Sequence, residues 1–339
     1  MSRVAALPYP PRRSTAPGRK SRRWQLLLRL LLPLGMLLFV VLLLNAVEGL
    51  DWGEVRQSLL RFERPQLVAA LLFTALAYTA AGSYELLSRR HEKLALPAPH
   101  CLAIGFIAYS IAANVSSLLG NAGARYRLYA QQGIGFRQAT RIAVFSVSSN
   151  WSGFVLLAGL AFTFVPPELP AHWSLPEPLL RAAGLTLLAL ALGYVFVCHR
   201  WARRGWQWRS MRYQLPTLPL ALGQLALSLV VWLGIAAVIH NFLPAKATLF
   251  MVLPVLLLST VAGLFIRLPA GVGVTEVVFV TLLGPTLGTS AVIAALLAYR
   301  AVFQLLPVLL AALLYLLLEL KGRRTLTAAG SRAAGTESA

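Results

Sequence analysis

Acidic residues and cysteines are scarce in this chain of 339 residues. It has 11 Asp and Glu against 31 Lys and Arg, and charged residues make up only 12% of the sequence. A soluble globular protein carries about 25% charged residues, so the composition excludes an ordinary soluble domain. The two cysteines, Cys101 and Cys198, are too few for a disulfide framework or a thiolate metal cluster.

Motifs of soluble enzymes are also missing. The five histidines show no metal-ligand spacing such as HxxxH, and the sequence has no P-loop, HExxH or GxSxG pattern. We therefore expect no metal, no cofactor and no enzymatic activity on water-soluble substrates.

Hydrophobic residues, by contrast, account for 58% of the chain and gather in long runs separated by short basic loops. Basic loops between apolar runs follow the positive-inside rule, which explains the net charge of +20 without a nucleic-acid partner. The same residues can bind anionic lipid headgroups. The pattern predicts a multi-pass protein of a bacterial inner membrane, in contact with membrane phospholipids.

The ends of the chain differ from its middle. We expect disordered tails at 1–23, which is rich in Pro, Arg and Ser, and at 321–339, which is small and polar. The membrane domain is predicted at 24–320. Its first apolar run, 25–46, is too long for a usual signal-peptide core, so we predict an uncleaved anchor. The basic clusters place both termini in the cytoplasm.

The membrane domain repeats one order of segments. Each predicted unit, 66–165 and 216–318, has a long span, an interrupted apolar segment and another long span. The first unit starts outside and the second inside, which predicts an inverted repeat with its site where the interrupted helices meet. The fold class is an all-α transmembrane helix bundle of about 7–8 spans.

The interrupted segments, 101–136 and 247–288, are predicted to be broken, re-entrant hairpins. Lipid cannot satisfy the backbone polar groups that a break exposes, so such breaks lie inside protein. The breaks are marked by four glycines: Gly120, Gly123, Gly271 and Gly273. The alternative is that every apolar run crosses, giving about ten spans, and loop charges fit both arrangements.

Glu276 directly follows the second break, in the stretch RLPAGVGVTE. A charge inside the membrane costs about 3 kcal/mol on insertion scales, so Glu276 needs a partner or a function. Arg300 is the expected partner, about 15 Å into the last span, and Gln304 is four residues on, on the same helical face. Glu276 either caps a half-helix or titrates during transport. Likewise, the pair either locks the bundle or lets Arg300 meet a lipid phosphate.

Arg125 and Arg127 follow the first pair of glycines. Because they are two positions apart, they cannot share one helical face, and we expect one to point into a cavity and the other toward the headgroups. Arginine binds phosphate in a bidentate way, although both side chains could simply snorkel. Asn150 shares a polar helical face with Ser146 and Ser149. It either contacts substrate or packs helix on helix.

Two segments resemble the motifs of a known family. GNAGARYRLY (120–129) is similar to G-G-x-x-x-R-Y-R-L, and PAGVGVTE (269–276) is similar to P-G-G-L-G-V-x-E. Both motifs belong to the lysylphosphatidylglycerol synthase transmembrane-region family, with its flippase-like domains, although Asn121 and Ala270 replace motif glycines. The residues on motif positions are Arg125, Arg127, Gly271, Gly273 and Glu276.

The resemblance implies a stand-alone member without the cytoplasmic aminoacyl-transferase domain, and therefore not an enzyme. We predict a lipid translocator for an anionic or aminoacylated phospholipid. Its expected substrate-binding residues are Arg125, Arg127, Asn150, Glu276, Arg300 and Gln304. One alternative is a non-transporting partner that recruits or regulates an envelope lipid-synthesis enzyme through the basic loop 199–212. Another is a membrane enzyme acting on a lipid-linked substrate.

Overall fold

The structure is a computed structural model of the chain. It describes six stretches: 52–114, 119–170, 176–202, 204–208, 211–266 and 273–319. Four sequence predictions fall outside these residues: the tails 1–23 and 321–339, the first span 25–46, and Gly271.

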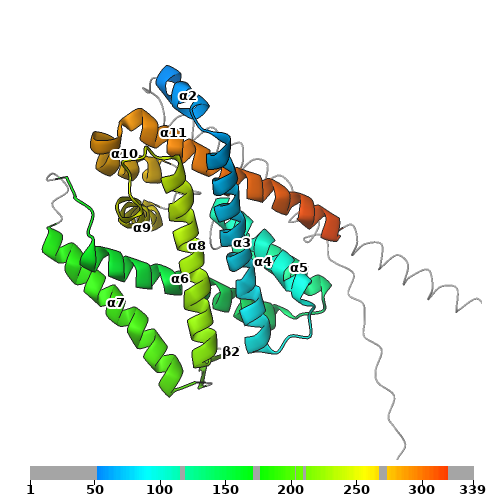
Figure 1. Cartoon of the computed structure of the whole chain (residues 1–339). Helices are drawn as coiled ribbons and strands as arrows, with labels where there is room; N and C mark the ends of the chain where they lie inside the picture. The colour runs from blue at the N-terminus through cyan, green and yellow to red at the C-terminus, as the bar shows by residue number, and fades with distance from the viewer. Residues whose placement is uncertain are drawn as a thin grey trace, which may run out of the picture.

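Long apolar helices make up most of the described chain and confirm the predicted all-α membrane bundle (Figure 1). Five described helices are long and apolar enough to cross a membrane. They are α3 (Arg64–Glu92), α6 (Phe136–Phe164), α7 (Glu177–Arg200), α8 (Leu218–Phe242) and the run Thr289–Glu319. This run, here called the last helix, contains α11 (Thr289–Tyr299) and the π-helical segment η3 (Arg300–Leu305).

Shorter apolar helices occupy the two interrupted segments. The first holds α4 (Ala98–Asn114) and α5 (Leu119–Gln131), with 17 and 13 residues. The second holds α9 (Leu249–Ile266) and α10 (Val274–Leu287), with 18 and 14 residues. A helix needs about 20 residues to cross the hydrocarbon core, so these lengths favour re-entrant hairpins over additional crossings.

The first helices of the two units, α3 and α8, lie side by side and run in opposite directions (Figure 1). At one end the Asn241 side chain donates to the Gln66 carbonyl over 2.7 Å. At the other end Gly223 faces the Leu87 side chain. An antiparallel pair of equivalent helices is the arrangement that an inverted repeat requires.

The two hairpins enter the bundle from opposite ends. Glu92, at the end of α3, forms a 2.7 Å ion pair with Arg141 near the start of α6, so the α4–α5 hairpin begins and ends at that side. At the other end, α2 (Trp52–Leu60) carries Glu54, which accepts a hydrogen bond from Ser290 at the start of α11. Phe62, just after α2, packs on Phe242 at the end of α8, so the α9–α10 hairpin begins and ends there.

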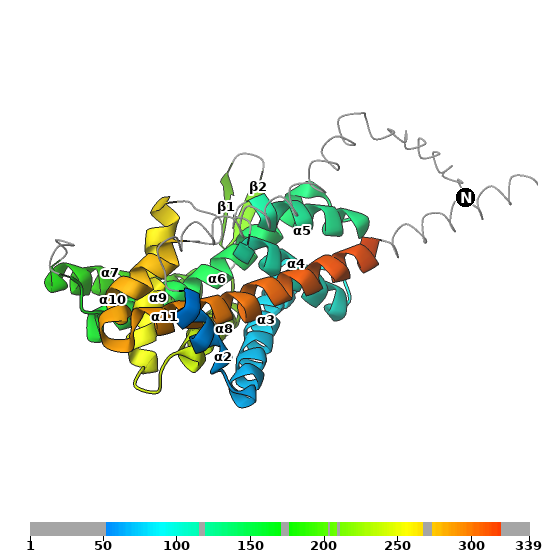
Figure 2. The same cartoon turned by 90° about the horizontal axis from the view of Figure 1, so that it is seen from above.

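The last helix joins the two hairpins. Figure 2 shows it running across the molecule, from beside α10 toward α4 and α5. Its buried Ala311 belongs to the apolar cluster formed with Cys101 of α4 and Leu128 of α5. The buried core elsewhere is formed mainly by α3, α6, α8, α9, α10 and α11.

Two elements lie at the periphery. Helix α7 packs along α6, where a Cβ on Gly159 would lie 2.7 Å from the Leu188 nitrogen, and it exposes most of its other face. Between α7 and α8, strands β1 (Gly205–Trp208) and β2 (Met211–Gln214) form an antiparallel hairpin. The sequence prediction treated this basic segment as a plain loop. Its alternating aromatic residues suit a strand, but a run of four residues is too short for a periodicity signal.

Candidate functional site: two buried arginine–glutamate pairs

The first pair joins Glu276 to Arg300. Gly273 caps α10 with φ 82°, and its N–H donates to Glu276 Oε2 over 2.9 Å. Glu276 thus lies in the first turn of α10, where the helix dipole favours a negative charge. Arg300 Nε donates to Oε1 over 2.5 Å and Nη2 donates to Oε2 over 2.9 Å. The predicted pairing of Glu276 with Arg300 is present, and the contact with Gly273 matches the capping alternative for Glu276.

Arg300 stands at the start of the π-helical segment η3. Its side chain is 2% exposed, and its Nη1 donates to Gln304 Oε1 over 3.1 Å. All three guanidinium nitrogens of Arg300 therefore have acceptors inside the bundle. Short π-helical segments within α-helices are frequent at functional sites, because the extra residue shifts side chains and leaves carbonyls to be bonded from elsewhere.

Those carbonyls receive hydrogen bonds from the other unit. The Asn114 side chain, at the end of α4, donates to the Gln304 carbonyl over 3.3 Å, and the Tyr78 hydroxyl donates to the Phe303 carbonyl over 2.8 Å. Asn114 borders the interruption of the first hairpin, and Gly273 borders that of the second. Residues beside both interruptions therefore meet at η3, as the inverted repeat predicts.

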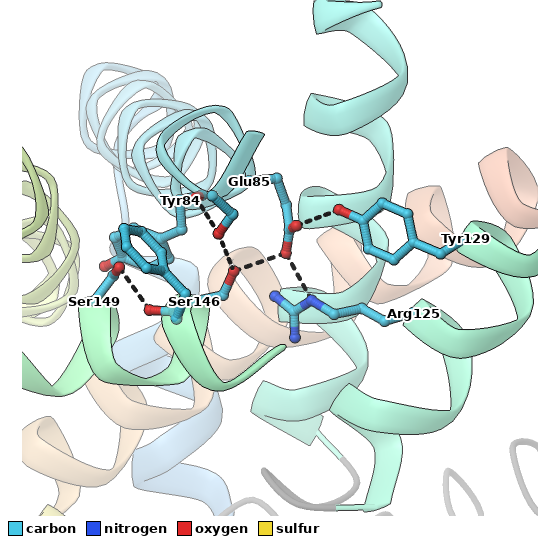
Figure 3. A network of polar contacts seen from close by, with 8 residues as sticks. Tyr84, Glu85, Arg125, Tyr129, Ser146 and Ser149 are labelled. Atoms are coloured by element: carbon cyan, nitrogen blue, oxygen red, sulfur yellow. Dashed lines mark hydrogen bonds and ion pairs between the residues drawn. The ribbon is translucent and has the colours of Figure 1, made fainter. Parts of the chain in front are cut away.

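The second pair joins Arg125 to Glu85, and sequence reasoning missed its carboxylate. Glu85 lies in α3 with 0% exposure, and Arg125 of α5, at 3% exposure, donates from Nε to Glu85 Oε1 over 2.6 Å. Figure 3 shows Glu85 enclosed by Arg125, Tyr129 and Ser146. The available signal was a carboxylate inside an apolar span, the same signal that singled out Glu276.

Hydroxyl groups complete the shell around Glu85. Tyr129 donates to Oε2, and Ser146 of α6 donates to Oε1 over 2.9 Å. Ser88, one turn along α3, lies 3.3 Å from the Ser146 hydroxyl. Helix α4 comes close at this level, because a Cβ on Gly105 would lie 2.8 Å from Glu85 Cγ. The Glu85 carboxylate is therefore hydrogen-bonded by two other helices, α5 and α6, while α4 packs against its side chain.

The other predicted site residues are placed apart from these pairs. Arg127 forms a 2.5 Å ion pair with Glu319 at the end of the last helix, and its side chain is 29% exposed. Arg125 and Arg127 thus point in different directions, as predicted. Asn150 lies where α6 meets α8, and its carbonyl accepts hydrogen bonds from Ser228 and Trp232. This contact matches the helix-packing alternative for Asn150.

Gly123 lies within α5, away from a break. Gly120 is the second residue of α5, close to the connection from α4 at 115–118, which lies outside the described residues. A glycine costs a helix only about 1 kcal/mol relative to alanine, which flanking contacts readily offset. Gly273, with its positive φ, does mark an interruption as predicted.

A lateral groove runs beside η3, between α3, α4 and the last helix. Its volume is about 570 Å³. The wall is almost entirely apolar, with Leu71, Tyr78, Leu102, Phe106, Leu306 and Leu310 among its residues. Thr74 also lines it, and the Thr74 hydroxyl is buried without a hydrogen-bond partner in the described part of the chain. Within the described ranges, no group of three His, Cys, Asp or Glu side chains could hold a metal ion.

Comparison with known proteins decides the family. The chain is 36% identical over 303 residues to the inner membrane protein YbhN of Escherichia coli (strain K12), a match covering 89% of this chain and 95% of that protein. The chain belongs to the YbhN family. It is also 28% identical over 261 residues to the uncharacterized protein slr0712 of Synechocystis, covering 76% of this chain and 80% of that one. No known protein-family model matches, so the resemblance to lysylphosphatidylglycerol synthases stays a prediction.

Membership of the YbhN family, together with the five long apolar helices, makes this chain a multi-pass protein of the inner membrane. A match of 303 residues necessarily includes residues 85 to 300. Both arginine–glutamate pairs therefore lie inside the region shared with YbhN.

Proposed function

We propose that the protein is a lipid translocator of the inner membrane, which moves an anionic or aminoacylated phospholipid without changing it chemically. The observation that carries the proposal is the lateral groove, an apolar pocket in the side of the bundle that Tyr78 connects to the segment η3. In this proposal both chain termini face the cytoplasm, as the basic clusters indicate.

The groove suits an acyl chain. At about 570 Å³ it falls within the range of small-molecule sites, but its walls lack the convergent polar groups that a water-soluble substrate needs. Leu71 and Leu102 face it from α3 and α4, and Leu306 faces it from the last helix. A hydrocarbon chain loses little by leaving the bilayer for such a surface, because both environments are apolar.

A polar region lies immediately behind this apolar surface. Tyr78 lines the groove with its ring and reaches the Phe303 carbonyl of η3 with its hydroxyl. Arg300 and Gln304 lie on the same segment. A lipid whose chain occupied the groove would hold its headgroup near Arg300, whose guanidinium charge attracts the phosphate while it stays paired with Glu276.

The experiment is lipid translocation in liposomes reconstituted with purified protein. Labelled phosphatidylglycerol and its lysyl derivative serve as probes. We expect transport by the wild type and at least about a tenfold loss in Glu276→Gln, which corresponds to about 1.4 kcal/mol of transition-state stabilisation. Arg181→Ala is the control, because Arg181 is an exposed arginine of α7, 52% exposed, outside the site.

A second arm tests the groove. Ala75→Trp places a large ring in the groove at an exposed position of α3, whereas Ala182→Trp places the same ring on the exposed face of α7. We expect only the first to block transport. Equal transport by both tryptophan variants would remove the groove from the path. Absence of transport for either lipid by the wild type would favour a non-transporting partner of a lipid-synthesis enzyme.

A further inference from the structure

We propose that the Glu85–Arg125 pair is a proton-exchanged phosphate site, in which a lipid phosphate binds Arg125 while Glu85 takes up one proton. The ligand class rests on the proposed translocator function. The exchange itself rests on the construction of the buried cluster, whose residues come from α3, α5 and α6.

Arg125 has a hydrogen-bond donor that the described part of the protein does not use. Its Nε donates to Glu85, but its Nη1 is buried and has no hydrogen-bond partner among the described residues. A guanidinium is always charged and its nitrogens can only donate, so a buried nitrogen without an acceptor is costly. An anion with several acceptor oxygens, such as a phosphate, would satisfy it.

Glu85 is held by groups that tolerate both of its protonation states. Tyr129 and Ser146 contact it through hydroxyls, which can accept a hydrogen bond as well as donate one. A neutral Glu85 could therefore donate to the Ser146 hydroxyl in place of its bond from Arg125. Ser88 extends the chain of hydroxyls by one further contact, toward the end of α3 that carries Arg89.

Charge balance links phosphate binding to the uptake of a proton by Glu85. A buried site holding Arg125, an ionised Glu85 and a phosphate would carry a net negative charge, which is expensive out of water. If a proton from water joins a Glu85 oxygen, Glu85 becomes neutral and Arg125 is left to pair with the phosphate. The site is then neutral before and after binding, and phosphate release returns the proton.

Few other groups near this site could take up the proton. The groups that contact Glu85 are Gly105 of α4, Arg125 and Tyr129 of α5, and Ser146 of α6. Ser88 of α3 contacts Ser146 in turn, and Cys101 of α4 lies within electrostatic range of both Glu85 and Arg89. Glu85 is the only carboxylate in this set. Arg127, two residues beyond Arg125 on α5 and 29% exposed, offers an approaching phosphate a first contact nearer the surface.

The test counts protons during binding. Short-chain phosphatidylglycerol, whose phosphodiester keeps one charge throughout, is titrated calorimetrically into the purified full-length protein in two buffers of different ionisation enthalpy. We expect an uptake of about one proton per lipid, and therefore an apparent affinity that falls as the pH rises, by up to about tenfold per pH unit. This arm needs no variant and so does not depend on a mutant's folding.

Two variants locate the proton. Glu85→Gln should bind the lipid without proton uptake and without pH dependence, since the amide is neutral at every pH. Glu92→Gln, which alters a more exposed glutamate paired with Arg141, should retain both the proton uptake and the pH dependence. Proton-free binding by the wild type, or unchanged uptake in Glu85→Gln, overturns the proposal.

The outcome also separates this inference from the proposed function. Transport of phosphatidylglycerol in liposomes without proton-linked binding would leave the translocator in place and remove the exchange site. Neither transport nor binding of the lipid would overturn both.

Discussion

The two buried arginine–glutamate pairs use the same residue types but differ in what surrounds them. Among the described residues, Glu276 accepts hydrogen bonds from a backbone N–H and a guanidinium, both of which can only donate. Glu85 accepts from one guanidinium nitrogen and two hydroxyls. Arg300 has acceptors for all three of its nitrogens, whereas Nη1 of Arg125 has none in the described part of the chain.

This difference indicates different roles. A carboxylate surrounded by obligatory donors is stabilised only when it is ionised, so the Glu276–Arg300 pair holds η3 and α10 in one arrangement. A carboxylate surrounded by hydroxyls can change its protonation state without losing all its partners. The ion pair that sequence reasoning found is thus the more rigid of the two, and the missed one is better built for exchange.

Removing the arginines should expose this contrast most strongly. Arg300→Ala leaves Glu276 buried without its partner, and we expect a loss of about 3–5 kcal/mol in the free energy of unfolding. Arg125→Ala should cost less, because Glu85 keeps its hydrogen bonds from Tyr129 and Ser146. Thermal unfolding in detergent measures both losses. Equal losses would contradict the comparison.

The glycines of the two hairpins provide a second contrast. Gly273→Ala forces a side chain onto a backbone with φ 82°, so we expect a loss of about 1–3 kcal/mol and a weakened Glu276 cap. Gly123→Ala should be neutral or stabilising by up to about 1 kcal/mol, since Gly123 is helical and an added Cβ would meet nothing within 4 Å. Denaturation midpoints of the two variants test this. A destabilised Gly123→Ala would show that α5 needs its glycine.

The two tyrosine hydroxyls give the smallest expected difference between paired variants. Tyr129→Phe removes a bond to the buried Glu85 and should cost about 1.5–3 kcal/mol, because hydrogen bonds to charged groups are the stronger kind. Tyr126→Phe removes a bond to the Thr140 hydroxyl, between neutral and partly buried groups, and should cost about 0.5–1.5 kcal/mol. Unfolding free energies under one condition rank the two. A reversed order would show that Glu85 does not depend on its hydroxyl shell.

The features of the fold and the site that could be predicted are those with a local pattern in the sequence. The apolar runs gave the long helices, and the doubled order of segments gave the inverted arrangement of the hairpins. Glu276 and Arg300 are 24 residues apart and their elements are neighbours in sequence, so their pairing could be inferred from depth alone. The same reasoning misplaced the first interruption, because GNAGAR carries two glycines that α5 accommodates without a break.

The sequence by itself determined the membrane bundle, its two units and the charged residues that had to be compensated, because hydrophobic runs and isolated charges are local properties. Only the tertiary structure decided the partners of Glu85, which lie 40 and 61 residues away on α5 and α6. Helix packing sets which side chains face one another across such distances, and spacing along the chain carries no measure of it. The same packing left one nitrogen of Arg125 unpartnered among the described residues. This nitrogen distinguishes the Glu85–Arg125 pair, which we propose to be exchangeable, from the more rigid Glu276–Arg300 pair.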